Sequence, residues 1–444
     1  MTPRLERFAR VGRLAIVGLL AALSVAALAA EQQVRLSVRT DRPDAVYAKG
    51  ETATFTIELT GAASQAEPPH AECEVSTDAF WHADKTAIGF LNGKAQLTAS
   101  RDFPCVLWVR VTYGEPAPTP EDPKAERKVQ AVGGAAFSPQ EIAPSMPAPD
   151  DFDAFWAQQR ARVDAIPPTP VLEPAQSPDP KVDLFSITMD NINETKVYGY
   201  LAKPKGDGPF PGYFQPQWAG VYSLDPAWAV GRAQQGFIAL NINAHAIPNG
   251  KPPEYYRALD AGALKGYPYQ GRESRETCYF LRMYLSDYRA IEYLVTRPEW
   301  DKKHLVVSGG SQGGGQAIVT AALDSHVTAV AADVPAMCDL TAVVAGRASG
   351  WPMLVAVKDG KPDPVQLQAA RYFDVVNFAR EVEVPVMIGT GFADLVCPAS
   401  SVFAAYNALP GPKEMVIDPL SDHQRGMDKW WKASWDFFIA HGKD

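Results

Sequence analysis

The first third of the chain alternates between hydrophobic and polar residues over short stretches. Residues 34–38 and 53–59 place apolar side chains at every second position, and residues 105–111 form a further apolar segment rich in valine. Such alternation is typical of strands that bury one face. Regular short strands between polar turns predict a small, sandwich-like all-β domain over residues 31–135.

The second pattern begins near residue 180, where unbroken apolar runs alternate with helical stretches. Such runs are typical of strands buried on both faces of a parallel sheet with helices on either side. The expected strands are 183–188, 197–202, 212–215, 237–242, 305–308, 329–334, 384–389 and 414–417. Helices are expected at 282–296 and 430–439, and another opens near Asp150 with Phe152, Phe155 and Trp156 on one face. Residues 136–444 are therefore predicted to form an α/β domain.

Two proline-rich stretches separate the patterns. Residues 114–128 are interpreted as an exposed loop or linker, and residues 139–149 lead into the α/β domain.

The N-terminal thirty residues differ from both patterns. Four arginines between positions 4 and 13 precede an apolar run at 14–28, which ends in the small-residue pattern Ala27-Leu28-Ala29. This is typical of a cleaved secretory signal. An uncleaved membrane anchor is the alternative, but the run is short for a membrane span. We expect residues 1–30 to be removed during export, which leaves a periplasmic or secreted protein with no stable membrane insertion.

The composition and net charge of the chain bear on whether it binds nucleic acid. The chain is 46% hydrophobic and 21% charged, as in ordinary globular proteins, and its net charge is −9 even with the basic leader. An acidic chain lacks the electrostatic footprint of a nucleic-acid-binding protein.

The five cysteines show no metal-binding pattern. Export permits disulfides, and Cys73 and Cys105 are the natural pair because both lie in the β-rich region, although the connectivity stays open. Cys278, Cys338 and Cys397 have no metal-like spacing and no clustered histidine, so no metal site is expected.

One motif carries clear chemistry. Gly309-Gly310-Ser311-Gln312-Gly313 is a Gly-x-Ser-x-Gly sequence between an apolar strand and a helix. In this arrangement a strained turn exposes the serine hydroxyl, and the helix N-terminus faces developing negative charge. The alternative, a phosphate-binding loop, lacks the Gly-Lys-Ser/Thr ending and the Gly-x-Gly-x-x-Gly pattern. Ser311 is therefore the candidate nucleophile, with the Gln312 amide as one oxyanion donor.

Of the seven histidines in the chain, His423 is the candidate general base. His423 lies after the last expected strand and before the last helix, where α/β-hydrolases carry it. His245 follows the strand at 237–242 and is either a site-lining residue or a buried, hydrogen-bonded one.

Asp394 is the candidate acidic partner of this histidine, because it lies in the loop after the strand at 384–389. Asp418 and Asp422 compete by proximity to the histidine, but their positions favour surface or capping roles.

The second oxyanion donor is expected in the loop after the strand at 212–215. The backbone N–H of Gln217 or of Trp218 is the candidate, and the register between them stays open. Trp218 is also read as a wall of the acyl pocket or as a simple packed residue.

Several separated segments together resemble the acetyl xylan esterase and cephalosporin C deacetylase family of α/β-hydrolases. They are residues 149–156, the nucleophile turn 309–314, the Pro-x-x-Cys-Asp segment 334–339, and residues 394–398 followed by Tyr406-Asn407. The resemblance covers roughly residues 145–440. It implies that Ser311, Asp394 and His423 form a triad acting on O-acetyl groups of sugars.

Two departures from the family pattern concern the site. Residues 241–245 replace the usual Arg-Gly-Gln, which affects substrate range and oligomeric assembly, and Gln424 replaces the usual glutamate after the histidine. The N-terminal β domain also lies outside the minimal family pattern.

The sequence thus predicts an exported serine esterase of the α/β-hydrolase fold. It would remove acetyl groups from acetylated xylan or xylo-oligosaccharides through an acyl-enzyme, with no metal or organic cofactor, and an oligomer is compatible with this function. The rival hypotheses are an exported serine peptidase of the same fold, against which Gln312 argues because peptidase relatives more often carry tyrosine there, and a non-catalytic carbohydrate-binding protein.

Overall fold

The computed structural model describes residues 34–61, 70–79, 83–116, 126–424 and 428–442. The predicted signal segment, residues 1–30, lies outside the described residues. Among the helices that are described, none is long and apolar enough to cross a membrane.

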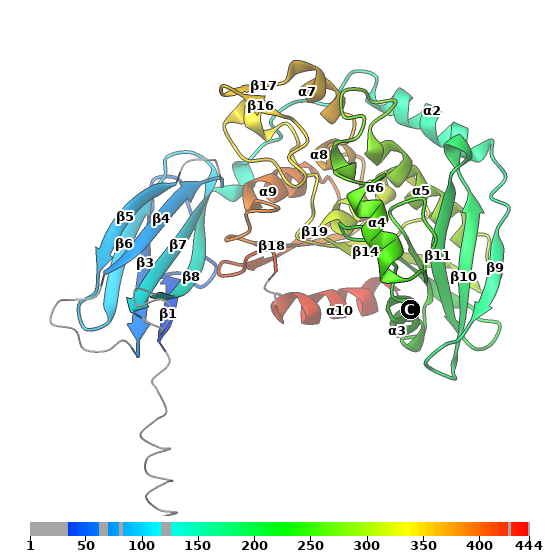
Figure 1. Cartoon of the computed structure of the whole chain (residues 1–444), viewed down its shortest axis with the longest axis horizontal. Coiled ribbons are helices and arrows are strands. Elements are labelled where there is room, and N and C mark those ends of the chain that lie inside the picture. The colour runs from blue at the N-terminus through cyan, green and yellow to red at the C-terminus, as the bar shows by residue number, and fades with distance from the viewer. Residues whose placement is uncertain (1–33, 62–69, 80–82, 117–125, 425–427, 443–444) are drawn as a thin grey trace, which may run out of the picture.

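The N-terminal part consists of two antiparallel-rich sheets, and its all-β character is confirmed (Figure 1). The smaller sheet has the order β1(Arg35–Thr40), β3(Thr52–Thr60), β6(Lys94–Ser100). The larger has the order β2(Val46–Tyr47), β8(Glu126–Phe137), β7(Cys105–Pro116), β4(His70–Thr77), β5(Asp84–Gly89). Alternate side chains of both sheets, such as Phe55 and Ile57 of β3 and Val109 and Val111 of β7, share one buried cluster. We call this part the β unit.

The interpretation of residues 114–128 as a linker was wrong at both of its ends. Gly114 pairs with Lys128 in the antiparallel ladder of β7 and β8. The two ends belong to one long hairpin, because the strand pairing continues beyond the valine-rich core of β7. Residues 117–125 lie outside the described residues.

The expected pairing of Cys73 with Cys105 is also wrong, since both are buried free thiols. Cys73 on β4 lies opposite Val111 on β7. Cys105 is therefore displaced along β7 by six positions, or roughly 20 Å at the strand rise. A disulfide needs Cα atoms within about 7 Å.

The larger part is a nine-stranded, mostly parallel sheet covered by helices on both faces (Figure 1). Neighbours from β13 through β19 run parallel, while β9, β10 and β11 form an antiparallel edge. The strand order is β19(Lys413–Asp418), β18(Val386–Gly391), β15(Ala329–Asp333), β14(Trp300–Gly310), β12(Phe210–Pro216), β13(Ile238–Ile242), β11(Lys196–Pro204), β10(Val182–Asp190), β9(Val171–Ala175). Central strands such as β13 and β18 are buried at every position, which explains their unbroken apolar sequences.

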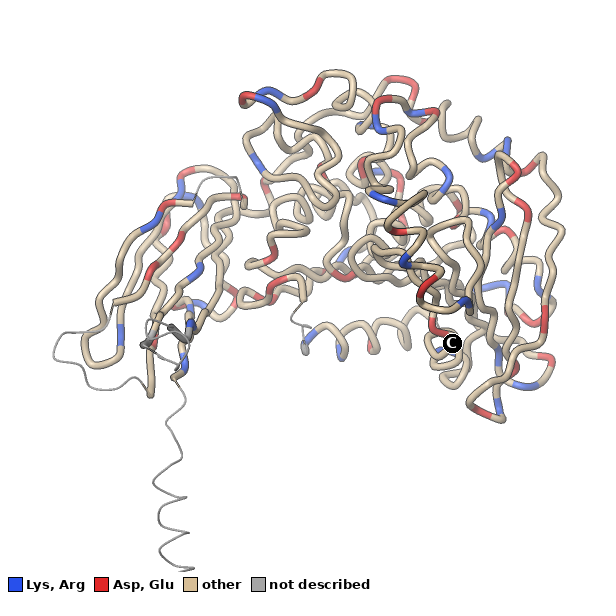
Figure 2. The backbone as a smooth tube through the Cα atoms, viewed as in Figure 1, with Lys and Arg blue, Asp and Glu red and all other residues tan. Residues whose placement is uncertain are grey.

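Two separate buried clusters divide the helices between the faces of the sheet. One face packs against α3(Pro226–Gln234) and α10(Asp428–Gly442), which lie below the sheet in Figure 1. The other packs against α2(Phe152–Asp164), α5(Tyr279–Leu294), α6(Gln312–Leu323), α8(Val375–Ala379) and α9(Ala399–Ala408). The two remaining α-helices of the described residues are α4(Pro253–Ala261) and α7(Pro364–Ala370). Figure 2 shows acidic and basic positions interspersed along both parts of the chain.

The β unit is joined to the larger part through the loops that follow β18 and β19. The backbone N–H of Gly134 on β8 donates a hydrogen bond to the carbonyl of Pro419 at 2.9 Å. A Cβ atom at Gly134 would lie only 2.6 Å from Cβ of Phe392. A second contact joins the N–H of Ala348 to the carbonyl of Asp78 at 3.2 Å. Glycine at position 134 is thus required by the close approach of the two parts.

We expect Gly134→Ala to lower the free energy of unfolding by about 1–3 kcal/mol, because the added methyl group overpacks this contact. Urea unfolding followed by tryptophan fluorescence measures the loss. Gly231→Ala is the control, since a Cβ there in α3 meets no atom within 4 Å. Equal stability of the Gly134→Ala variant and the native protein would contradict the close contact.

Candidate active site

Ser311 lies on the turn between β14 and α6, at the carboxyl edge of the sheet. Its backbone has φ 53° and ψ −121°, a conformation that non-glycine residues rarely adopt. Two hydrogen bonds hold this turn: the Ser311 N–H donates to the carbonyl of Asp333, and the N–H of Ala336 donates to the carbonyl of Ser311, each at 2.9 Å. The strain points a half-buried hydroxyl out of the sheet edge.

The flanking glycines allow this turn to form. A Cβ at Gly309 would lie 2.3 Å from the carbonyl oxygen of Gly313, and a Cβ at Gly313 would lie 2.8 Å from that of Pro216. Neither position has room for a side chain, which is the physical reason for the Gly-x-Ser-x-Gly pattern.

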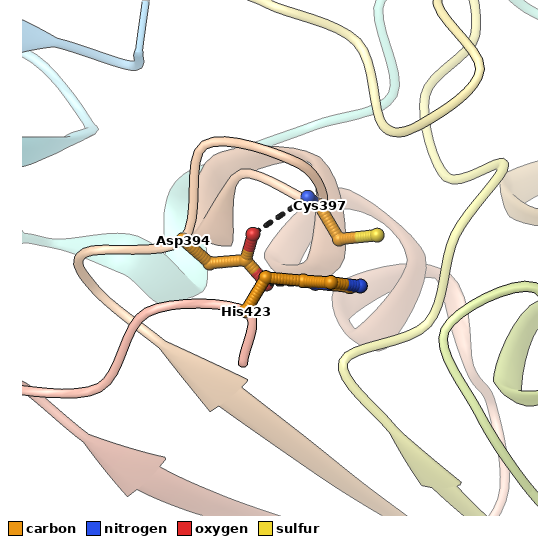
Figure 3. A group of neighbouring side chains, drawn as sticks. All are labelled: Asp394, Cys397 and His423. Atoms are coloured by element: carbon orange, nitrogen blue, oxygen red, sulfur yellow. Dashed lines mark hydrogen bonds and ion pairs between the residues drawn. The ribbon is translucent and has the colours of Figure 1, made fainter. Parts of the chain in front are cut away.

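The structure brings Ser311, His423 and Asp394 together in one hydrogen-bonded chain. Nε2 of His423 lies 3.0 Å from Oγ of Ser311, and Nδ1 lies 2.7 Å from Oδ2 of Asp394. Figure 3 shows the histidine and the aspartate side by side. The histidine is in the loop after β19 and the aspartate in the loop after β18, so they approach the serine from neighbouring strands. This order lets a serine hydroxyl transfer its proton to an imidazole that a carboxylate orients.

The carboxylate of Asp394 is fully buried, and backbone N–H groups bind the oxygen that does not face His423. Its Oδ1 accepts hydrogen bonds from the backbone N–H groups of Val396 and Cys397, both at 2.8 Å. By contrast, Asp418 accepts from the N–H of Leu420, and Asp422 accepts from the N–H of Gln424. The two competing aspartates cap local turns, as their sequence positions suggested.

Cys397 also lies beside this group. Ligand atoms of Asp394, Cys397 and His423 all lie within 4.8 Å of one another (Figure 3). Burial raises the pKa of the Cys397 thiol well above its ordinary value, so the thiol stays protonated.

The loop expected to supply the second oxyanion donor is bound to the nucleophile helix. The carbonyl of Gln217 accepts hydrogen bonds from the side-chain amides of Gln312 at 3.2 Å and Gln316 at 2.9 Å. Gln217 is buried, whereas 41% of Trp218 is exposed. Trp218 therefore faces solvent beside the serine turn, and the choice between the N–H groups of residues 217 and 218 stays a prediction.

His245 corresponds to the second of its two sequence interpretations, a buried and hydrogen-bonded residue. It is 1% exposed, with Nδ1 2.6 Å from the hydroxyl of Tyr279 and Nε2 3.0 Å from the carbonyl of Gly220. Burial lowers its pKa to about 4, which keeps the ring neutral near pH 7.

A tyrosine continues this network to the serine turn. Tyr267 packs edge-on against the His245 ring, accepts from the N–H of Gly220 and donates to Oε1 of Gln312. His245 therefore contacts the serine turn indirectly, through Tyr267 and Gln312, and does not line the site.

Asp333, at the end of β15, also lies at the serine turn and was not predicted from the sequence. Besides accepting from the Ser311 N–H, this residue carries a carboxyl whose Oδ1 is enclosed and accepts no hydrogen bond from the described residues. Burial raises its pKa to about 7; the charge of His423 partly opposes the shift and that of Asp394 adds to it. The one available signal was its position: a carboxyl residue at the end of an apolar strand next to the nucleophile strand.

We expect the stability of the native protein to fall relative to Asp333→Asn as pH rises from 5 to 8. The unfolded chain releases this proton near pH 4, but the folded protein keeps it until about pH 7, so folding takes up a proton in between. Asparagine removes that penalty, and its advantage should grow by about 1–3 kcal/mol over this range. Urea unfolding of both proteins at pH 5 and pH 8 measures it; a pH-independent difference would contradict the raised pKa.

Comparison with known proteins identifies the larger part of the chain. A model of the acetyl xylan esterase (AXE1) family matches residues 139–441. Acetyl esterase Axe7A of Xylanibacter ruminicola is 34% identical over 294 residues, which is 65% of this chain. The match spans 66% of that relative's own length.

Solved structures agree on the fold. An acetyl xylan esterase from a Paenibacillus species is 25% identical, with a TM-score of 0.59, and covers 68% of this chain and 98% of its own. Acetyl xylan esterase 1 from a Thermoanaerobacterium species has the same TM-score at 21% identity, covering 68% of this chain and 97% of its own. The resemblance found in the sequence and the α/β-hydrolase fold are both confirmed, and strands β1–β8 precede the matched region.

Proposed function

The chain belongs to the acetyl xylan esterase family, and on that premise we propose that it is a serine carboxylic-ester hydrolase that removes O-acetyl groups from carbohydrates. The observation that carries the proposal is the hydrogen-bonded chain from Ser311 through His423 to Asp394. The names of the two solved acetyl xylan esterases favour acetylated xylan, or xylo-oligosaccharides derived from it, as the substrate.

In the proposed reaction, His423 takes the proton of Ser311 as the oxygen attacks the ester carbonyl. The buried carboxylate of Asp394 stabilises the imidazolium that forms. The negative charge on the carbonyl oxygen is held by the N–H of Gln312 at the start of α6, together with one from Gln217 or Trp218. The sugar hydroxyl leaves with the proton from His423.

The second half of the reaction repeats these roles with water. His423 removes a proton from water as it attacks the acetyl-serine, and acetate leaves with restoration of the Ser311 hydroxyl. Every proton moves through the imidazole, so the chain's own residues are sufficient for the chemistry.

The proposal also includes export of the enzyme from the cytoplasm. The basic and apolar leader at residues 1–30 would carry the enzyme to the periplasm or out of the cell, where polymeric xylan is accessible. The N-terminal sequence of the protein recovered from the periplasm or medium, rather than the cytoplasm, tests this part.

Acetate release tests the activity itself. Purified residues 31–444 should release acetate from acetylated xylo-oligosaccharides and from p-nitrophenyl acetate. Cleavage of aminoacyl p-nitroanilides instead would identify a peptidase, and xylan binding with no hydrolysis would identify a binding protein.

A further inference from the structure

A groove of about 520 Å³ lies between α3 and α10. Both helices run along the same face of the sheet (Figure 1). This volume falls in the usual range for small-molecule sites, about 300–1,000 Å³. Four tryptophans and several polar side chains line it, among them Trp218, Trp228, Trp431, Trp435, Gln215 and Ser434.

The tryptophans present unusual apolar surface to solvent. Trp431 is 64% exposed and Trp218 is 41% exposed, and the rings of Trp218 and Trp228 lie 4.4 Å apart between centroids. Large exposed aromatic groups mark binding surfaces, because leaving them in water is unfavourable. The electron-rich face of an indole attracts the weakly positive C–H groups on the flat face of a sugar ring.

The polar groups of the groove suit a neutral, hydroxyl-rich ligand. Arg232 is the only charged side chain among the described residues that line it. Its guanidinium lies over the rings of Tyr213 and Phe438 and donates to Oε1 of Gln235 at 3.0 Å. The guanidinium keeps its positive charge, but its face and one of its N–H groups are occupied by these contacts, and the other polar groups that line the groove are uncharged.

The groove is linked to the proposed catalytic residues through Trp218 and through α10. Trp218 belongs to both, since it follows Gln217, whose carbonyl is bonded to Gln312 beside the nucleophile. The opposite wall, α10, begins at Asp428, only five residues after His423. Each wall of the groove is thus connected along the chain to a segment that carries proposed catalytic residues.

We propose that this groove binds the sugar units next to the acetylated one in a neutral polysaccharide chain. The inference rests on the proposed function and adds that the enzyme recognises several consecutive units. The units beyond the acetylated sugar would stack on Trp228, Trp431 and Trp435 and bond to Gln215 and Ser434.

The test compares acetylated xylotetraose with p-nitrophenyl acetate, which is too small to reach the groove. In Trp431→Ala, the ratio of kcat/KM for the tetrasaccharide to kcat/KM for p-nitrophenyl acetate should fall about tenfold, the loss expected for one aromatic contact. Calorimetry with unacetylated xylotetraose should show weaker binding by a similar factor. Phe103→Ala removes an exposed aromatic ring of the β unit and should leave the ratio unchanged.

Failure of this inference is distinguishable from failure of the proposed function. A native protein that hydrolyses neither ester contradicts the esterase itself. Hydrolysis of both esters with an unchanged ratio in Trp431→Ala overturns the groove alone. A dimer that Trp431→Ala converts to a monomer, by light scattering, with the ratio unchanged, would show that a second copy covers the groove.

Discussion

Replacing Ser311 with alanine should reduce the turnover of acetyl ester hydrolysis by a factor on the order of 10⁶, by analogy with nucleophile replacements in other serine hydrolases. The reason is the loss of the proposed nucleophile, the Oγ atom that lies 3.0 Å from Nε2 of His423. Water would have to attack the ester directly, with help from the oxyanion donors alone. Release of p-nitrophenol and of acetate, measured at saturating substrate, gives the loss.

Ser308→Ala is the control that separates loss of the nucleophile from a loss of folding. Ser308 lies in the same strand, β14, and is nearly buried, so Ser308→Ala changes the same atom without touching the proposed proton transfer. Its turnover should stay within about tenfold of the native value, since effects of this kind act through stability, typically 0.5–3 kcal/mol. If Ser308→Ala is as inactive as Ser311→Ala, or if Ser311→Ala keeps native turnover, the assignment of the nucleophile is wrong.

Asp394→Asn should reduce turnover by about 10⁴, the loss seen when the carboxylate of such a triad becomes an amide. The amide oxygen can still accept from the N–H groups of Val396 and Cys397. Its neutral NH₂ group, however, cannot stabilise the imidazolium and favours the wrong tautomer of His423. KM for p-nitrophenyl acetate should change little.

Asp422→Asn is the control for this replacement. Asp422 neighbours the histidine in sequence, and its carboxylate accepts from the N–H of Gln424, which an asparagine oxygen can replace. Its turnover should remain close to native. A larger loss in Asp422→Asn than in Asp394→Asn would show that the wrong aspartate has been assigned.

The three residues of the hydrogen-bonded chain could be singled out in the sequence because each has a local signal. Ser311 carries a glycine pattern that only a strained turn requires, and His423 follows the last strand in a chain with few histidines. Asp394 follows a buried strand whose apolar sequence is unmistakable. Parallel strands bring these loops to one edge of the sheet, so chain order alone predicts their meeting.

Features that depend on the packing of distant segments could not be predicted. The register of β4 against β7 separates Cys73 from Cys105, and composition says nothing about register. The neutral state of His245 and the raised pKa of Asp333 both follow from burial by residues far away in the sequence. The approach of Gly134 to Phe392 likewise has no local signature.

That approach has an evolutionary and practical consequence. The β unit contacts the larger part of the chain at Phe392 and Pro419, which lie in the same two loops as Asp394 and His423. Recombination therefore cannot exchange the β unit freely for another domain. Any replacement needs a residue without a side chain, as at Gly134, where its backbone contacts those loops. Chimeras that join this hydrolase part to a foreign N-terminal partner need to inherit strand β8 together with both loops.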